Sequence, residues 1–172
     1  MKKLITLLMA LAFVMPDLLG ETGTVTLGNG TTTNTTTGHP TPYGTYYKNH
    51  RVQYLVLAGE LASLGLAPGD ITAIGFDVAN VNNCNAMPNY TMMVKFTDAN
   101  ELTTAFDNEG YTTVWTSDEF LPENGWNTHT FSTPMNWDGE SNLLIDVCFD
   151  LVETYSQNAS VYYTATATNL TN

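Results

Sequence analysis

Alternating apolar and polar side chains mark the centre of this chain as an extended, half-buried segment. One face carries Tyr90, Met92, Val94 and Phe96, and the opposite face carries Thr91, Met93, Lys95 and Thr97. A period of two is typical of an antiparallel strand that lays one face on a core. Shorter apolar runs predict further strands over residues 51–57, 71–79, 111–116, 126–131, 143–149 and 161–167. In 143–149, Leu143, Ile145, Val147 and Phe149 share one face.

Turn residues separate these segments at short intervals, for example at residues 68–70, 122–125 and 138–139. Residues 58–64 have helical spacing and stop at Gly65, so we expect one or two helical turns there. Together with a segment near the N-terminus, the pattern predicts about seven to eight strands and almost no helix. This favours an all-β fold, an antiparallel β-sandwich of two packed sheets, with a closed barrel as the alternative.

The N-terminal segment, residues 22–27, is strand-like and precedes a tract of Gly, Asn and Thr over residues 28–38. β-Branched residues favour an extended backbone, whereas Gly and Asn favour turns and irregular chain. A strand on such a tether can pair with its own body or with a neighbouring copy. As a donor strand it would consist of Thr24, Val25, Thr26 and Leu27, with Val25 and Leu27 pointing inward unless the register slips by one. The alternative is that it forms the first strand of its own sandwich.

The first residues have the layout of a secretory signal. Lys2 and Lys3 precede an apolar run over residues 4–15, which is too short for a membrane span of roughly 20 residues. We expect a signal peptide over residues 1–20 with cleavage after Gly20, then a donor strand and linker over 21–37 and a sandwich domain over 38–172. The mature chain would be secreted to the extracellular side, with no membrane span after signal removal.

Charge narrows the range of partners. The formal net charge is −12, with five Lys and Arg against 17 Asp and Glu, and charged residues make up only 13% of the chain. A basic face that could bind nucleic acid is therefore excluded, because the phosphate backbone would be repelled. The polar surface must come largely from Thr and Asn, which is more typical of exported β-proteins than of cytosolic enzymes.

Two kinds of covalent modification are candidates in an exported chain. Cys84 and Cys148 are the only cysteines and could form a disulfide, with two buried free thiols as the alternative. Glycosylation-type sequons begin at Asn29, Asn34, Asn89, Asn158 and Asn169. In a chain so rich in Asn and Thr, sequons also arise by chance.

Several motifs resemble a β-sandwich domain common in secreted surface and adhesin proteins of Bacteroidota-type bacteria. They lie at residues 24–31, 42–48, 51–55, 69–78, 89–92, 125–128, 131–134, 137–139 and 147–149, with Gly69-Asp70-Ile71-Thr72-Ala73-Ile74-Gly75-Phe76-Asp77-Val78 as the longest. A single export-tagged sandwich with a tethered leading strand also resembles the immunoglobulin-like protomers of bacterial fibrils that assemble by donor-strand exchange. The resemblance implies a pilus-like filament subunit, a homopolymer whose sandwich is completed by a neighbour's strand. The family tends to continue beyond the last expected strand, whereas this sequence stops at Asn172.

Catalytic and metal-binding signatures are not found in the sequence. It has no Gly-x-Ser-x-Gly elbow, no His-Glu-x-x-His and no phosphate-binding loop. His39, His50 and His129 have no sequence-adjacent acid or nucleophile. Acidic residues at 107–123 could supply a glycosidase pair, but a solvated acidic face is far more common. Oxygen-bearing residues at 77–83 and 138–140 could bind calcium, but they lack the spacing of a known calcium loop. We expect no enzyme activity, no catalytic residue, no cofactor and no metal.

The alternative function is a secreted cell-surface adhesin or carbohydrate-binding module. In that case exposed aromatic residues, such as Trp115, Trp126 or Trp137, would stack on the sugar rings of a glycan. The remaining aromatic residues near the N-terminus, Tyr43, Tyr46 and Tyr47, could instead supply subunit interfaces.

Overall fold

A computed structural model describes residues 23–28, 30–150 and 152–172. The expected signal peptide lies outside this part, as does Asn29. The described residues form eight strands and one short helix: β1 (Thr32–Thr33), β2 (His50–Val56), α1 (Ala58–Ser63), β3 (Gly69–Asn80), β4 (Met87–Thr97), β5 (Thr112–Phe120), β6 (Gly125–Trp137), β7 (Asn142–Phe149) and β8 (Ser160–Tyr163).

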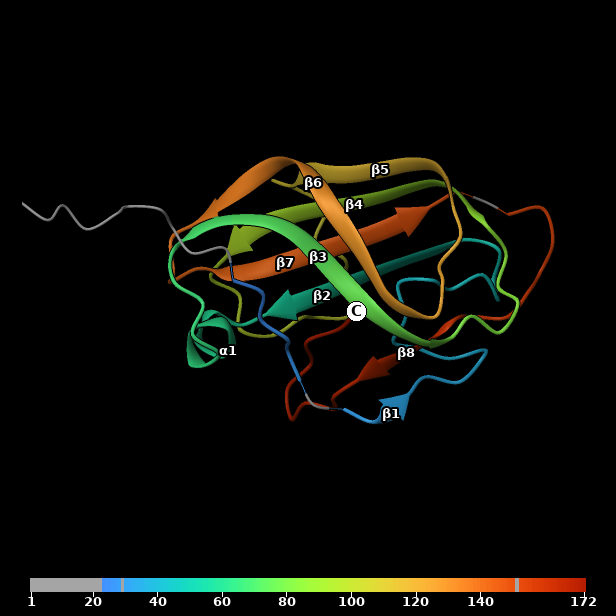
Figure 1. Cartoon of the computed structure of the whole chain (residues 1–172), viewed down its shortest axis with the longest axis horizontal. Helices are drawn as coiled ribbons and strands as arrows, with labels where there is room; N and C mark the ends of the chain where they lie inside the picture. Colours follow the sequence, from blue (N-terminus) through green and yellow to red (C-terminus); the bar gives the residue numbers. More distant parts are fainter. Residues whose placement is uncertain (1–22, 29, 151) are drawn as a thin grey trace, which may run out of the picture.

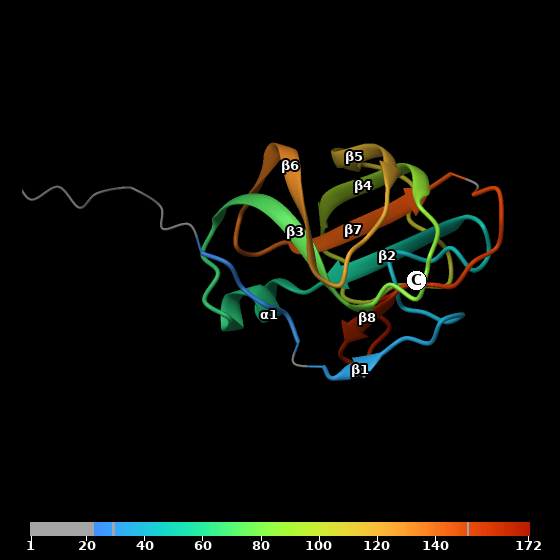
Figure 2. The ribbon, with the colours of Figure 1, turned by 45° about the vertical axis from the view of Figure 1, so that its right-hand side comes forward.

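The strands form two antiparallel four-stranded sheets, and the expected all-β sandwich is confirmed. One sheet has the order β1-β8-β3-β6 and the other the order β2-β7-β4-β5. Figure 1 shows β3 and β6 in front of β2, β7 and β4, and Figure 2 shows the two layers from a turned direction, with α1 at one end. All strand connections except β4–β5 pass from one sheet to the other, so each hydrophobic face is closed by the opposite layer.

The core lies between the sheets and follows the predicted alternation. Tyr90, Met92 and Val94 of β4 are fully buried there, and Ile145 and Val147 lie beside them on the neighbouring strand β7. Antiparallel pairing places the partners of these strands on the same inner face. Burial of side chains of this size contributes roughly 1.5–3 kcal/mol each, which makes β4 and β7 the centre of the fold.

Strand β7 is buried on its outer face as well, which the alternation did not predict. Leu144 lies on that face in a cluster with Leu55 and Leu170, and Leu102 and Tyr111 pack against the same cluster. The segment between β4 and β5 and the residues near 170 therefore cover this part of the sheet.

Some strand bounds differ from the sequence prediction. β6 continues past residue 131 to Trp137, and the register between β3 and β6 shifts between Ile71 and Ala73. Pro134 lies in this irregular stretch, where a missing backbone N–H does not interrupt a regular ladder. β8 is shorter than the predicted 161–167, because the chain leaves the sheet after Tyr163.

The first strand is also not where the sequence placed it. Residues 23–28 form no strand with their own chain, so the alternative in which they begin their own sandwich is wrong. The first strand is β1, inside the expected linker, where Thr32 and Thr33 pair with Tyr163 and Tyr162 of β8.

Candidate functional site

The N-terminal segment 23–28 runs beside the body without joining a sheet, between α1 and β1 in Figure 1. Val25 is half-buried and packs against the cluster formed by Ala58, Leu61 and Trp137. Leu27 is 42% exposed. Thr24 and Thr26 are exposed as well. Of the two expected inward side chains, Val25 therefore packs against a buried cluster of its own body, and Leu27 is the more exposed.

The Thr/Asn tract is more closely attached than a simple linker. A Cβ at Gly30 would overlap the carbonyl of Tyr163, so this stretch passes directly against β8. The buried side chain of Asn34 then bonds to the backbone at the start of β8, as a neighbouring strand would. Its Nδ2 donates to the carbonyl of Ala159 (3.1 Å) and its Oδ1 accepts from the N–H of Val161 (2.7 Å). The tract is therefore anchored to the body from Gly30 onward.

Residues 170–172 occupy the outer edge of β2. The N–H groups of Gln53 and Leu55 donate to the carbonyls of Asn172 and Leu170, both at 2.8 Å, and the N–H of Asn172 donates to the carbonyl of Gln53 at 3.0 Å. This short pairing continues the β2-β7-β4-β5 sheet by three residues. Sequence reasoning missed it, because no apolar alternation marks residues 168–172.

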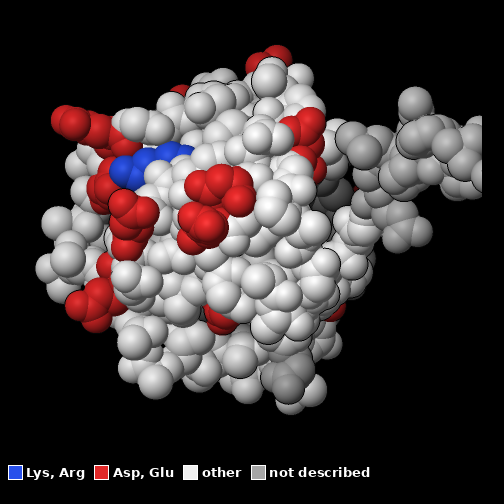
Figure 3. All heavy atoms as spheres, turned by 90° about the vertical axis from the view of Figure 1, so that its left-hand side faces the viewer, with Lys and Arg blue, Asp and Glu red and all other residues white. Residues whose placement is uncertain are grey.

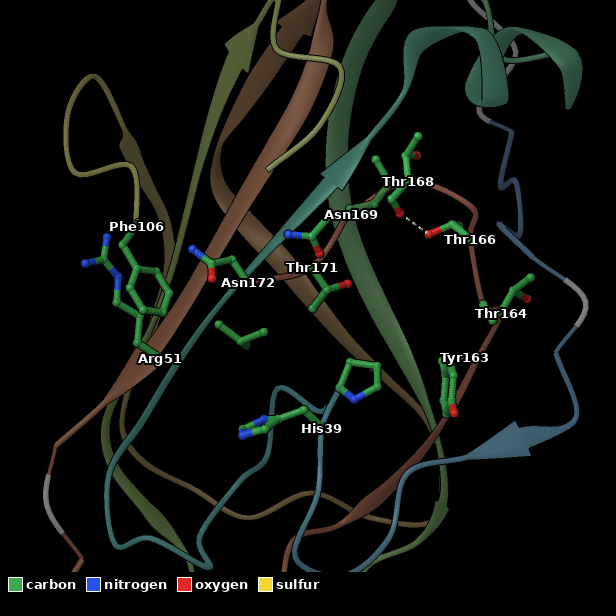
Figure 4. A pocket seen from close by; sticks show the side chains of 14 residues that line it. His39, Arg51, Phe106, Tyr163, Thr164, Thr166, Thr168, Asn169, Thr171 and Asn172 are labelled. Carbon is green, nitrogen blue, oxygen red and sulfur yellow. Dashed lines mark hydrogen bonds between the residues drawn. The ribbon is translucent and has the colours of Figure 1, made fainter. Parts of the chain in front are cut away.

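A groove of about 590 Å³ lies beside this pairing, at the seam between the two sheets. One wall is formed by residues 163–172, and the other by His39, Pro40, Arg51, Val52 and Phe106. Figure 4 shows the polar side chains of Asn169 and Asn172 near the centre and Arg51 beside Phe106. The Arg51 guanidinium lies 4.9 Å from the centre of the Phe106 ring. The groove combines a partly open strand edge with mixed polar and apolar walls.

A charge pair between the half-buried Arg51 and the buried Asp146 lies under this edge on the outer face of the sheet. Arg51 donates to the fully buried carboxylate of Asp146 from Nη2 (2.6 Å) and Nε (3.0 Å). Gln53 adds a bond from Nε2 to the same carboxylate (2.6 Å) and others to the Asp107 carbonyl and the Tyr111 hydroxyl. The hydrogen bond to Asp146 raises the pKa of Arg51. The network fastens the segment between β4 and β5 to the sheet.

Basic residues are few, and most are used internally. Lys95 forms an ion pair with Asp107 (2.6 Å), and this bond lowers the pKa of Asp107. Figure 3 shows one end of the molecule, where acidic side chains surround a single small basic area. The negative charge at this end of the molecule would repel an anionic partner.

The two cysteines are free thiols, so the expected disulfide is not formed in this structure. Cys84 is buried in the core cluster together with Val147 and Phe149. Cys148 lies between these two residues on β7, and its side chain therefore points to the opposite face of the sheet. Burial raises the pKa of the Cys84 thiol to about 11, which keeps it protonated and unreactive.

We expect both thiols to react when the protein is unfolded without a reducing agent. Iodoacetamide added in denaturant should modify Cys84 and Cys148 completely, and the melting temperature should be the same with and without a reductant. Peptide mass spectrometry would contradict this expectation if it found the two cysteine peptides joined.

The predicted glycosylation sites fall into different environments. Asn34 and Asn158 are buried, and both amides hydrogen-bond to the backbone, so the folded chain does not offer them for modification. Asn89 and Asn169 are exposed, and Asn29 is outside the described residues. Local sequons do not reveal this, because the partners of the buried amides are distant in sequence.

The three tryptophans also differ. Trp137 is buried between α1 and the sheets and donates from Nε1 to the Ser141 carbonyl (2.7 Å), while Trp115 is half-buried against the core. Trp126 is 59% exposed. Of the aromatic side chains named for glycan stacking, Trp126 alone presents most of its surface to solvent.

Other kinds of site are not seen in the part of the chain that the structure describes. Its His, Cys, Asp and Glu side chains form no group of three or more that could hold a metal ion. No helix among these residues is long and apolar enough to cross a membrane. Comparisons with protein-family models, with curated proteins and with solved structures give no match.

Proposed function

We propose that the chain is a structural subunit of an extracellular, pilus-like filament, joined by strand exchange of residues 24–27 between copies. The observation that carries this proposal is a mismatch between sequence and pairing. Residues 24–27 have the β-branched alternation of a strand, yet in the single chain residues 23–28 pair with no strand. A neighbouring copy can supply the missing partner, since main-chain hydrogen bonds and alternate side chains are the basis of strand addition.

The energies favour exchange over the contact within one chain. Val25 is half-buried and Leu27 is 42% exposed, so their docking on the own body contributes roughly half of their full burial energy, about 1.5–3 kcal/mol. Full burial of both side chains in a neighbour would contribute roughly 3–6 kcal/mol, in addition to new backbone hydrogen bonds. Releasing the segment therefore costs less than its insertion gains.

The outer edge of β2 is the acceptor that fits best. In the single chain it carries a pairing of only three residues, and the groove beside it extends along Arg51 and Val52. A donor strand would replace or extend residues 170–172 there. Open strand edges are the surfaces on which proteins add strands from other chains. The secretory layout of residues 1–20 and the Thr/Asn-rich surface support an extracellular location for such a polymer.

Electron microscopy of point variants tests the proposal. The chain from residue 21 onward should form filaments in negative stain, and Val25→Asp/Leu27→Asp should stay monomeric, because burial of two carboxylates in place of apolar side chains is costly. The monomer itself should lose only about 1.5–3 kcal/mol of stability, since both side chains are only partly buried. An excess of a peptide of residues 21–28 should shorten the filaments by capping acceptor edges.

A matched variant separates strand exchange from a general charge effect. Thr24→Asp/Thr26→Asp adds the same charges on the opposite face of the strand, and it should still assemble. Filaments formed equally by both double variants would argue against exchange of this segment. A wild-type chain that sediments as a monomer at all concentrations would rule out the filament.

A further inference from the structure

The outer face of the sheet β1-β8-β3-β6 carries two exposed aromatic rings in one cross-strand row. Asp77 of β3 pairs with Trp126 of β6. On the other side of β3, Val78 pairs with Val161 of β8, and both valines face the core. The residues next to them, Asp77 and Tyr162, therefore lie side by side on the outer face. Trp126 and Tyr162 thus flank Asp77, with exposed fractions of 59% and 45%.

The orientation of Trp126 is supported by a glycine. A Cβ placed on Gly75 would lie 3.4 Å from Cε3 of the Trp126 indole and 3.2 Å from Oγ1 of Thr128. The indole therefore packs over the backbone of β3 at a position that has no side chain. A larger residue at 75 would lift the ring off the sheet, so Gly75 and Trp126 act together to present an aromatic surface.

The carboxylate between the rings has no partner in the described part of the chain. No hydrogen bond or ion pair to the Asp77 carboxylate is found there, although the residue is half-buried. Neighbouring strands lie about 4.8 Å apart, so the backbones that carry the two rings lie roughly 10 Å apart, with the Asp77 carboxylate on the strand between them. A span of this size lets both rings and the carboxylate contact one extended polysaccharide chain.

The surroundings favour a neutral carbohydrate over other partners. The cations of the described chain, Lys48, Arg51 and Lys95, lie outside this sheet, so an anionic polymer would be repelled. The apolar area consists of two rings beside exposed threonines and a carboxylate. A stable protein interface needs about 800 Å² per partner around an apolar centre. A pyranose instead offers an apolar ring face for stacking and hydroxyl groups that can donate to a carboxylate.

We propose that Trp126, Asp77 and Tyr162 form a binding platform for a neutral, extended polysaccharide. The two rings stack on sugar faces, and Asp77 accepts hydrogen bonds from sugar hydroxyls, which fixes the register of the ligand. The platform belongs to the single folded chain and does not depend on strand exchange. In a filament it would be repeated along the fibre.

Isothermal titration with soluble neutral polysaccharides tests the platform. The probes are cellohexaose, laminarin and a soluble mannan, with alginate as the anionic comparison. The wild-type chain should bind at least one neutral probe and not alginate. Trp126→Ala and Tyr162→Ala should each weaken binding about tenfold or more, the effect expected for the loss of one aromatic contact, and Asp77→Asn should weaken it several-fold.

Tyr155→Ala is the matched control, since Tyr155 is an exposed aromatic residue (72%) outside this row. It should leave binding unchanged. Binding should also shift the fluorescence of the wild-type protein and not that of Trp126→Ala.

The proposal is overturned if no neutral probe binds, if Tyr155→Ala weakens binding as much as Trp126→Ala, or if Trp126→Ala alters only self-association. Monomeric Val25→Asp/Leu27→Asp protein should bind as wild type does, so a failure of filament assembly and a failure of glycan binding remain distinguishable.

Discussion

Arg51→Met is expected to lower the free energy of unfolding by about 3–5 kcal/mol, as measured by urea denaturation at pH 7. The Arg51 guanidinium is the cationic partner of the fully buried Asp146 carboxylate. Removing one member of a buried ion pair leaves the other charge without compensation, and the cost is typically of this size. The loss should be accompanied by faster hydrogen exchange in residues 98–111, because Arg51 also binds the Asp107 carbonyl and Asn108.

A double variant shows whether the cost comes from the isolated charge. Arg51→Met/Asp146→Leu removes both charges, and it should recover most of the stability lost in Arg51→Met. Lys95→Met removes the more exposed pair with Asp107 and should cost about 1 kcal/mol or less. If Arg51→Met unfolds at the same urea concentration as the wild-type chain, the charge pair does not stabilise the fold as described.

The alternation of β4 and β7 could be predicted from the sequence because it is a local property. Side chains two positions apart share a face whatever the rest of the chain does, so Tyr90, Met92, Val94, Ile145 and Val147 were assigned correctly. The same parity places Cys148 on the outer face of β7. Because Cys84 lies in the core, this position of Cys148 would have argued against a disulfide between the two cysteines.

Contacts between distant residues could not be predicted in this way. Arg51 and Asp146 are separated by 95 positions, and Asn34 and Val161 by 127. Each pair depends on which strands become neighbours, and a single sequence does not reveal strand order. The edge pairing of residues 170–172 was missed for the same reason. A charged residue inside an apolar strand, such as Asp146 between Ile145 and Val147, is the one local signal that could have indicated a buried partner.

The platform residues show an intermediate case. Trp126 was recognised as a candidate for stacking, but so were Trp115 and Trp137, because composition does not separate exposed from buried aromatic residues. The register between β3, β6 and β8 makes the difference, since it brings Trp126, Asp77 and Tyr162 into one row. The role of Gly75 could not be seen at all before its cross-strand neighbour was known.

The buried His129 is a source of pH dependence in the core. Its Nε2 is hydrogen-bonded to the Tyr43 hydroxyl at 2.9 Å, and Nδ1 has no partner among the described residues. The ring stacks on Tyr90, with 5.6 Å between ring centres, and contacts Trp115 at 4.4 Å. Burial lowers the pKa of His129 from 6.5 to about 4, because the apolar surroundings disfavour the charged imidazolium.

We therefore expect the protein to lose stability as the pH falls from 6.5 towards 4. In this window the unfolded chain binds a proton at His129 and the folded chain does not, so His129 alone should lower the free energy of unfolding by about 2.5 kcal/mol between pH 7 and pH 4.5. His50, whose pKa burial also lowers to about 4, changes stability in the same direction. Side-chain hydrogen bonds lower the pKa values of Asp138 and Asp107, so protonation of these two carboxylates destabilises the fold only at still lower pH.

Urea denaturation at pH 7 and pH 4.5 measures this loss. His129→Gln is expected to be less stable at pH 7, because it leaves the Tyr43 hydroxyl and the aromatic cage with a poorer partner, but its stability should change less between the two pH values. The difference in pH dependence between the two proteins separates the effect of the histidine from the general cost of a core substitution. An unchanged urea m-value would confirm that the unfolded state is the same. A variant that loses as much stability on acidification as the wild-type chain would show that His129 is not the proton acceptor, and His50→Gln would then be the next variant to compare.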